Sequence, residues 1–329
     1  MLAVLEAEGL VRASLHSEAS RFLLILEPGD NRSSLLDWAA SERDRLRALL
    51  QEHAAILFRG FSEPATAPEF QSFIEATCAG ALLEYTQGST PREAVSGMVS
   101  TATVYPSDRS IPLHNELSYA HEWPRTLWFQ CHQPAEQGGA TPLADSRRVF
   151  AGIDSRVRDR FIEHGVMYVR NYGELIDVPW QESFLTDDKQ QVEELCEERG
   201  IEYEWLDRNG LRTEQVCQAV AEHPVTGETV WFNQAHLFNV ASLPTKRRDQ
   251  LVRVFGERGL PRNSYFGNGE PIDNASLEAV RASYDAERVA FSWQAGDVLM
   301  VDNMLAAHGR DPFSGERAVW VGMAEAHGA

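Results

Sequence analysis

The pattern of hydrophobic and polar positions changes near residue 100. Before that point, residues 37–53 carry apolar side chains at helical spacing, with arginine and glutamate between them, which predicts a helix. Residues 54–61 form an almost continuous apolar run that ends at glycine, as expected of a buried strand. Residues 68–78 return to helical spacing and stop before Gly80. We therefore expect residues 1–80 to form α/β elements that pack on a larger core.

Beyond residue 100, short runs rich in β-branched and aromatic residues recur, each bounded by turn-forming residues. They occupy residues 111–119, 127–134, 165–172, 201–206, 229–234, 289–293, 297–303 and 317–323. Two helical stretches interrupt them, at residues 186–199 and 242–257. The first of these begins with a Thr-Asp-Asp cap and ends before glycine. Many short strands with turns between them predict a mainly β protein, a barrel or jelly roll with helices packed outside it.

The chain shows no internal repeat and no long Pro/Gly/Ser-rich linker, so we expect one domain over residues 1–329. Its 329 residues, 43% of them hydrophobic, suffice for a sizeable core. That composition excludes a disordered chain, a collagen-like repeat and a disulfide-stapled miniprotein.

The charge balance limits the partners. The chain has 30 basic and 49 acidic residues, a net charge of −19, which repels phosphate backbones and anionic membranes. We therefore expect no nucleic acid and no membrane as partner. The four cysteines are scattered singly and form no CxxC motif, which predicts reduced thiols and a cytoplasmic location. The first fifteen residues lack a basic stretch ahead of a long apolar run, so we expect no secretory signal.

The triplet His114-Asn115-Glu116 is the sharpest local feature. On a strand, residues two apart point to the same face, so His114 and Glu116 would project together. An imidazole beside a carboxylate makes two thirds of the facial triad that holds non-haem Fe(II). A polar strand face with an unrelated histidine and glutamate would give the same triplet.

Two later segments could complete such a site. A strand-like run at residues 296–308 ends with His308, and Arg317 opens another strand nine residues later. A separation of 194 residues between His114 and His308 suits a rolled-up sheet that brings distant strands together. Gly138-Gly139 indicates a turn, and the hydroxyl of Thr141 behind it could bond a ligand carboxylate. A purely structural turn is the alternative.

Together these segments resemble the TauD/TfdA-like family of Fe(II)/2-oxoglutarate dioxygenases. The resemblance is carried by HNE at 114–116, GGATPLAD at 138–145, GDVLMVDNMLAAHGR at 296–310 and GERAVWV at 315–321. EYTQGSTPRE at 84–93 and IPLHNELSY at 111–119 are similar to the clavaminate synthase-like and syringomycin-type amino-acid hydroxylases. The resemblance covers roughly residues 80–325. It implies a double-stranded β-helix (jelly-roll) core with a large insertion at about residues 173–288.

The resemblance also implies roles for individual residues. His114, Glu116 and His308 match the Fe(II) ligands, and Thr141 and Arg317 match the residues that contact the 2-oxoglutarate carboxylates. A guanidinium suits that last role because it is planar, permanently charged and able to bind a carboxylate with two hydrogen bonds. The loop between His308 and Arg317 is short compared with some members of the family, so Arg310 is a rival for this contact.

The implied reaction is hydroxylation. Family halogenases have a small residue where Glu116 stands, so the carboxylate favours oxygen insertion over halogenation. The branch implies an amino-acid substrate, oxidised by O2 at an unactivated carbon in natural-product biosynthesis, either free or linked to a carrier protein. Asn115, Tyr119 and Asn233 are candidates for substrate contact, with ordinary structural hydrogen bonds as the alternative. Four arginines form a candidate patch for an acidic carrier, although a solvated helix face would look the same: Arg147, Arg148, Arg156 and Arg158.

Three other functions compete with this one. The same iron site could catalyse desaturation or another oxidation. The chain could be a non-catalytic barrel that binds a small ligand. A zinc hydrolase could use the same His/Glu/His set, but it has no use for the arginine.

Overall fold

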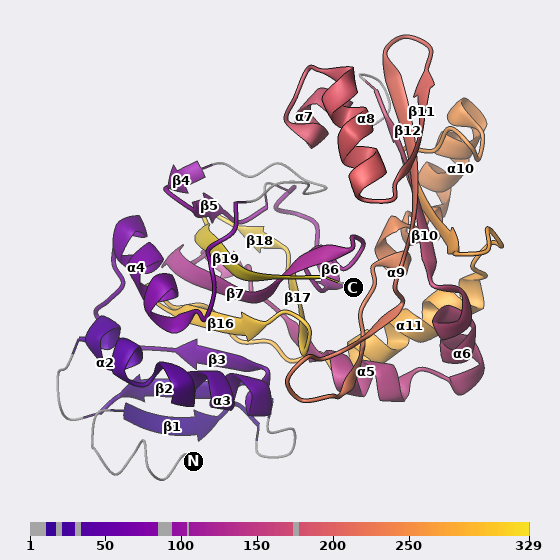
Figure 1. Cartoon of the computed structure of the whole chain (residues 1–329). Coiled ribbons are helices and arrows are strands. Elements are labelled where there is room, and N and C mark those ends of the chain that lie inside the picture. Colours follow the sequence, from indigo (N-terminus) through magenta and orange to yellow (C-terminus); the bar gives the residue numbers. More distant parts are fainter. Residues whose placement is uncertain are drawn as a thin grey trace.

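The computed structural model describes residues 11–17, 22–29, 34–84, 94–103, 105–173 and 178–328. Its largest sheet has eight strands in the order β1-β2-β3-β16-β7-β19-β5-β4 (Figure 1). The strands are β1 (Val11–Leu15), β2 (Leu24–Pro28), β3 (Ala55–Phe58), β4 (Ala94–Ser96), β5 (Val99–Thr101), β7 (Glu122–Gln133), β16 (Val298–Asp302) and β19 (Ala318–Gly328). Every residue of β3 and β16 is buried, as their apolar sequences require.

Three helices cover one face of this sheet: α2 (Leu35–Ser41), α3 (Arg43–His53) and α4 (Ala67–Thr77). Their apolar stripes pack on the sheet and form one hydrophobic cluster with it. α4 begins with a capping box in which Thr66 and Glu69 satisfy each other's backbone N–H groups. The helix predicted over residues 37–53 is two helices, because the chain leaves helical geometry at Glu42.

The second face of the large sheet lies against a smaller sheet, in the order β6-β17-β9. Its strands are β6 (Ile111–His114), β9 (Leu143–Asp145) and β17 (Ala306–Arg310), with β8 (Gln137–Gly138) and β18 (Phe313–Ser314) paired beside them. The rings of Phe129 on β7 and His308 on β17 lie 5.1 Å apart between the sheets. Side chains of β17 therefore reach the space between the two sheets.

The segment between β9 and β16, residues 146–297, is called here the intervening segment. It forms a four-stranded sheet in the order β11-β12-β10-β15 and a hairpin of β13 and β14. The strands are β10 (Val166–Tyr172), β11 (Glu202–Leu206), β12 (Gly210–Cys217), β13 (Val220–Glu222), β14 (Thr229–Trp231) and β15 (Arg262–Phe266). The helices are α5 (Ser146–Gly152), α6 (Ser155–His164), α7 (Trp180–Phe184), α8 (Lys189–Glu198), α9 (Ala235–Phe238), η1 (Val240–Ser242), α10 (Thr245–Phe255) and α11 (Asn274–Ala286). Figure 1 shows this segment on the side of the molecule opposite α2 and β1.

Two predicted strands need correction. The strand predicted over residues 111–119 ends at His114, and a turn follows in which Leu117 has a φ of 56°. The strand predicted over residues 289–293 is extended chain with a single isolated bridge, from Val289 to Leu143. Residues 85–93, which carry part of the sequence resemblance, lie outside the described residues.

The described cysteines are all buried and free of disulfides: Cys78, Cys131, Cys196 and Cys217. Among the described residues, no helix is both long and apolar enough to cross a membrane.

Candidate metal centre

Three side chains from distant parts of the chain meet between the two sheets. His114, Glu116 and His308 each offer a ligand atom, and these atoms all lie within 4.8 Å of one another. β6 and β17 pair antiparallel with His114 directly opposite His308, so the register itself brings the two imidazoles together. Their ring centroids are 4.6 Å apart. The expected convergence across 194 residues is therefore present in the structure.

Glu116 reaches this cluster in a different way from the predicted one. It does not share a strand face with His114, because β6 has already ended. The turn that follows carries Glu116, and hydrogen bonds from Ser118 N to Asn115 O and from Ala120 N to Leu117 O hold the turn. The carboxylate is nearly buried, with 6% of its residue surface exposed.

Asn303 attaches this turn to the core. Its side-chain oxygen accepts a hydrogen bond from Glu116 N at 2.7 Å, and its Nδ2 donates to Glu116 O at 2.9 Å. The same Nδ2 donates to Pro124 O, and the backbone oxygen of Asn303 accepts from Asn115 Nδ2. One fully buried amide thus fixes the backbone of Glu116 on both sides. Sequence reasoning did not single out Asn303, although it lies in the run that carries the resemblance.

The intervening segment holds the same turn from the other side. Gln234 Nε2 donates to Asn115 O at 2.8 Å, and Gln218 Nε2 donates to Ser118 O at 2.9 Å. His236 Nε2 lies 2.9 Å from Leu113 O, just ahead of His114. Because a carbonyl only accepts, this nitrogen carries a proton. Burial lowers the pKa of His236 to about 3, so its ring is neutral at neutral pH.

The same argument fixes the tautomer of His114. Its Nδ1 lies 2.8 Å from Pro112 O, so Nδ1 is the protonated nitrogen. Nε2 is then the basic nitrogen available to a metal, with its ring orientation set by the backbone.

The donor set is suited to iron. Two imidazoles and one carboxylate are the ligands of non-haem Fe(II) sites, which keep further positions open. A cavity adjoins the three donors on one side. Its other lining residues come from the loop after β5, from strands of both sheets and from the chain just ahead of β9 and β19: Ala102, Thr103, Ile111, Phe129, Thr141, Gly309, Arg310, Arg317, Val319 and Val321.

Arg317 is a cation on the wall of this cavity. Burial lowers the pKa of its guanidinium to about 10, and repulsion from Arg310 adds to the shift, so it stays charged at neutral pH. Its Nε donates to Gly139 O at 3.0 Å, a bond that does not use the two terminal nitrogens. Gly139 has a φ of +70°, and a Cβ there would lie 3.0 Å from Arg317 Cδ. The Gly-Gly turn thus shapes the arginine's position.

Arg310, the rival, has its terminal nitrogens on backbone oxygens. NH1 donates to Tyr105 O, and NH2 donates to Pro106 O and Arg109 O. This guanidinium therefore fixes the loop ahead of β6. Thr141 is buried on the cavity wall, where its hydroxyl accepts a hydrogen bond from Trp293 Nε1 at 3.0 Å.

The three candidate substrate contacts have different surroundings. Asn115 donates to Ser146 Oγ and Asn303 O, and Asn233 donates to Ala219 O and accepts from Ala235 N. Both amides are buried and serve the fold in these bonds. Tyr119 lies instead on the wall of a second cavity, against the intervening segment.

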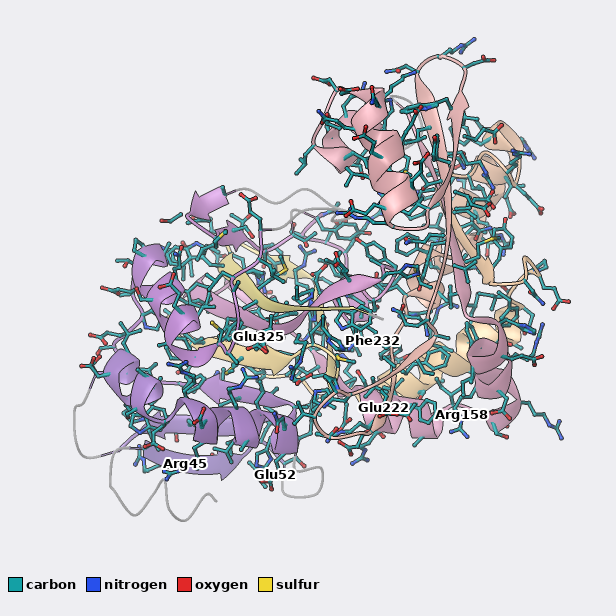
Figure 2. The ribbon with its side chains drawn as sticks, in the orientation of Figure 1. Arg45, Glu52, Arg158, Glu222, Phe232 and Glu325 are labelled. Carbon is teal, nitrogen blue, oxygen red and sulfur yellow. The ribbon has the colours of Figure 1, made fainter. Side chains whose placement is uncertain are left out.

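Arginines of the candidate carrier patch are engaged with neighbouring groups. Arg147 pairs with Asp145 and Glu228, and Arg148 pairs with Glu287. Arg158 donates to Phe150 O and lies on α6, at the end of the molecule away from α2 (Figure 2). Structural contacts therefore account for three of the four.

Comparison with known proteins places the chain in a family. Residues 26–323 match the model of "Taurine catabolism dioxygenase TauD, TfdA family". The dapdiamide synthesis protein DdaC of Enterobacter agglomerans is 39% identical over 277 residues, 84% of this chain and 83% of that protein. A clavaminate synthase-like protein of Arabidopsis thaliana is 32% identical over 289 residues, covering 85% and 84%.

Among solved structures, PvcB of Pseudomonas aeruginosa superposes with a TM-score of 0.56 at 17% identity, covering 95% of this chain and 91% of that one. That likeness concerns the fold, a sheet-rich core with helices. The family match and the two relatives go further: the chain belongs to the TauD/TfdA dioxygenase family and is an enzyme of that class.

Proposed function

We propose that the protein is an Fe(II)- and 2-oxoglutarate-dependent hydroxylase of an amino acid or amino-acid derivative in natural-product biosynthesis. The observation that carries the proposal is the cluster of His114, Glu116 and His308 with the partly buried Arg317 in one cavity. When bound, iron and 2-oxoglutarate supply the activation of O2. The protein's part is to hold the metal, orient the keto acid and position one C–H bond of the substrate.

Each residue has a distinct task in this proposal. The two imidazoles and the Glu116 carboxylate hold the metal and leave one side open toward the cavity. Arg317 binds the distal carboxylate of 2-oxoglutarate with its two terminal nitrogens, since a guanidinium and a carboxylate match in shape and charge. Thr141 offers its hydroxyl to the same cosubstrate. The apolar wall of Phe129, Val319 and Val321 keeps water away from the reacting groups.

The fold supports the same proposal. The large sheet and the β6-β17-β9 sheet face each other and would form the double-stranded β-helix, with the metal between them. The proposal includes a single domain, with residues 1–80 packed on the core and an insertion at about residues 173–288. The four-stranded sheet also includes β10, so it begins before that boundary.

The relatives bear on the pathway and on the cofactors. DdaC is named for dapdiamide synthesis, and PvcB is described as an Fe, alpha-ketoglutarate dependent oxygenase from an isonitrile synthetic pathway. Another structural neighbour, AAD-2, was crystallised with Mn(II) and N-oxalylglycine. These names favour a small-molecule substrate in biosynthesis. A carrier-bound substrate and a cytoplasmic location stay predictions.

Desaturation or another oxidation at the same iron would use the same residues, so only the product separates it from hydroxylation. A non-catalytic barrel would have no need of a partly buried arginine beside a complete donor set.

The test measures succinate release from 2-oxoglutarate by the iron-loaded protein, over a panel of free and carrier-bound amino acids, followed by mass analysis of the product. We expect one substrate to stimulate release and to gain one oxygen atom. Glu116→Ala is the matched inactive control. A wild-type protein that binds neither Fe(II) nor 2-oxoglutarate would refute the proposal.

A further inference from the structure

A second cavity lies beside the metal centre, on the wall formed by the intervening segment. Its described lining includes Tyr119 and Ala120, which belong to the turn that carries Glu116. Tyr119 follows Glu116 by three residues, a stretch that spans at most about 11 Å. A molecule in this cavity is therefore within reach of the cavity that contains the metal donors.

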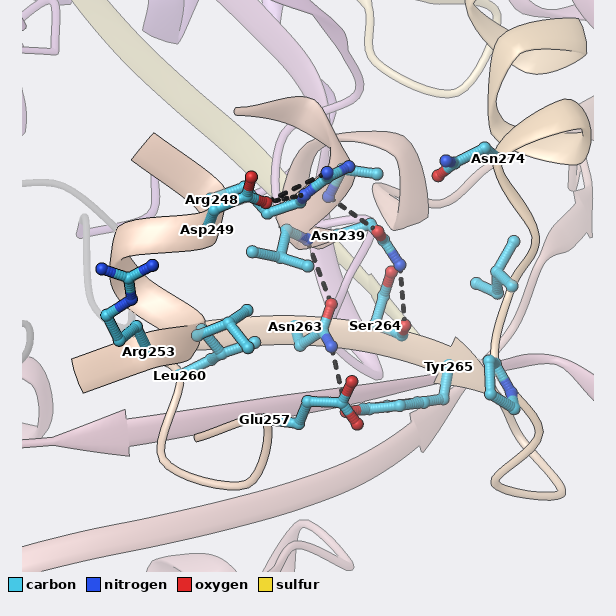
Figure 3. Close-up of a pocket in the computed structure, with 15 residues that line it drawn as sticks. Asn239, Arg248, Asp249, Arg253, Glu257, Leu260, Asn263, Ser264, Tyr265 and Asn274 are labelled. Carbon is cyan, nitrogen blue, oxygen red and sulfur yellow. Dashed lines mark hydrogen bonds and ion pairs between the residues drawn. The ribbon is translucent and has the colours of Figure 1, made fainter. Parts of the chain in front are cut away.

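The charge of this lining is unusual for so acidic a chain. Two arginines, Arg170 and Arg199, line the cavity, and the described residues around it include no aspartate or glutamate. By contrast, the hollow between α10 and β15 in Figure 3 mixes Arg248 and Arg253 with Asp249 and Glu257. The cavity beside Tyr119 combines two lining arginines with proximity to the turn that carries Glu116.

Arg170 is set into this wall from the middle of β10. It is 8% exposed, and its guanidinium lies over the ring of Tyr172 at 4.6 Å. Stacking on an aromatic face orients the planar fork of the guanidinium, whose shape and charge match those of an oxyanion.

A second guanidinium lies opposite it. The register of β10 and β15 pairs Arg170 with Arg262, so the two side chains share one face of the sheet. Arg262 lies over Phe238, another lining residue, at 5.6 Å. Two guanidinium groups on one face of this sheet concentrate hydrogen-bond donors that suit an oxyanion.

We infer that this cavity binds an oxyanionic group of the primary substrate, with Arg170 as the principal contact and the rings of Tyr119, Tyr168 and Phe238 around it. The inference rests on the proposed function, because it treats the bound molecule as the substrate of the adjacent metal centre. The oxyanion comes from one of two sources: the carboxylate of a free amino acid, or the phosphate of a phosphopantetheine arm that carries a thioester-linked one.

The experiment compares charged and neutral probes on the whole protein loaded with Fe(II) and 2-oxoglutarate without oxygen. One arm titrates L-amino acids against their primary amides, and the other titrates pantetheine 4′-phosphate against pantetheine. Binding is followed by calorimetry. We expect the anionic member of at least one pair to bind at least about tenfold more tightly, which corresponds to 1.4 kcal/mol. The arm that shows the preference identifies the source.

Variants assign the effect to the arginine. Arg170→Gln should abolish the preference, Arg170→Lys should keep part of it, and Arg253→Gln, which removes an exposed arginine on α10, should leave it unchanged. If Arg170→Gln does not fold, Arg262→Gln carries the same test, with a weaker preference expected. The inference is overturned if no anionic probe binds the wild type, if neutral probes bind equally well, or if the preference survives in Arg170→Gln.

A separate readout distinguishes this inference from the proposed function. The weak visible band of bound iron and 2-oxoglutarate is recorded in the same samples. Its absence from the wild type defeats the proposed function, whereas its presence without any preference for anions defeats only the oxyanion cavity.

Discussion

Gly139→Ala tests how the Gly-Gly turn places Arg317, the arginine proposed to bind 2-oxoglutarate. The added Cβ would lie 3.0 Å from Arg317 Cδ and 3.1 Å from Arg317 Nε, closer than ordinary van der Waals contact. The side chain of Arg317 must move by a few tenths of an ångström, and its hydrogen bond to Gly139 O must lengthen or break. The backbone contributes a second effect, because a φ of +70° costs an L-residue about 1–2 kcal/mol.

The size of the expected effect on 2-oxoglutarate binding follows from these contacts. A hydrogen bond to a charged group is worth about 1.5–3 kcal/mol, so weakening one such bond to 2-oxoglutarate raises the required concentration by roughly 10-fold or more. In urea, the free energy of unfolding should decrease by about 1–2 kcal/mol because alanine is strained at this positive φ. Metal binding should be unchanged, because the altered residue contacts none of the three donors.

Gly227→Ala is the matched control. Its φ is +69°, and nothing lies within 4 Å of the place where the added methyl group would sit, so it carries the backbone cost without the contact to Arg317. Both variants should therefore lose similar stability, and only Gly139→Ala should need more 2-oxoglutarate for half-maximal succinate release. Equal 2-oxoglutarate requirements in the two variants would refute the reasoning.

Four further outcomes are expected. Glu116→Ala should abolish hydroxylation and weaken Fe(II) binding while circular dichroism stays that of the wild type; retained turnover would remove Glu116 from the donor set. Asn303→Ala should lower the free energy of unfolding by about 3 kcal/mol, because three hydrogen bonds of about 1 kcal/mol each are lost. It should also weaken Fe(II) binding. A decrease of less than about 1 kcal/mol in the free energy of unfolding in urea would contradict the role of Asn303 in holding the turn. Arg317→Ala should raise the 2-oxoglutarate requirement more than Arg310→Ala, and the reverse order would transfer the contact to Arg310. The pKa of His236 is about 3 in the fold against 6.5 in the unfolded chain, so the fold holds this side chain neutral. Its contribution to the free energy of unfolding is therefore complete above about pH 6.5 and is lost as the pH falls toward 3. The slope from this one proton reaches about 1.4 kcal/mol per pH unit, and unfolding curves of His236→Gln between pH 7 and pH 4 should lack it.

The sequence predicts the donor residues better than the geometry that joins them. Apolar runs such as β16 are readable because burial on both faces demands them. The turn at Glu116 is not readable from local periodicity, because its bonds come from Asn303, Gln218 and Gln234, each about a hundred residues or more away. The pairing of β6 with β17 likewise depends on strand register between distant segments. Periodicity alone could not supply it, and the resemblance to a family implied only which residues converge.

Contacts in the two cavity walls also could not be predicted from local sequence. Thr141 is recognisable beside its Gly-Gly turn, but its hydrogen bond from Trp293 joins positions 152 residues apart. The arginine pair of Arg170 and Arg262 depends on the pairing of β10 with β15, and residues 173–261 separate the two strands. Arginines spaced this far apart carry no common signal in the sequence.

The turn that carries Glu116 is held by two partners at once, Asn303 from the core and the amides of Gln218 and Gln234 from the intervening segment. Sequence change in that segment is therefore constrained at these two positions. A segment that lacked the two amide donors would loosen the turn and, with it, the carboxylate of Glu116, the proposed metal ligand.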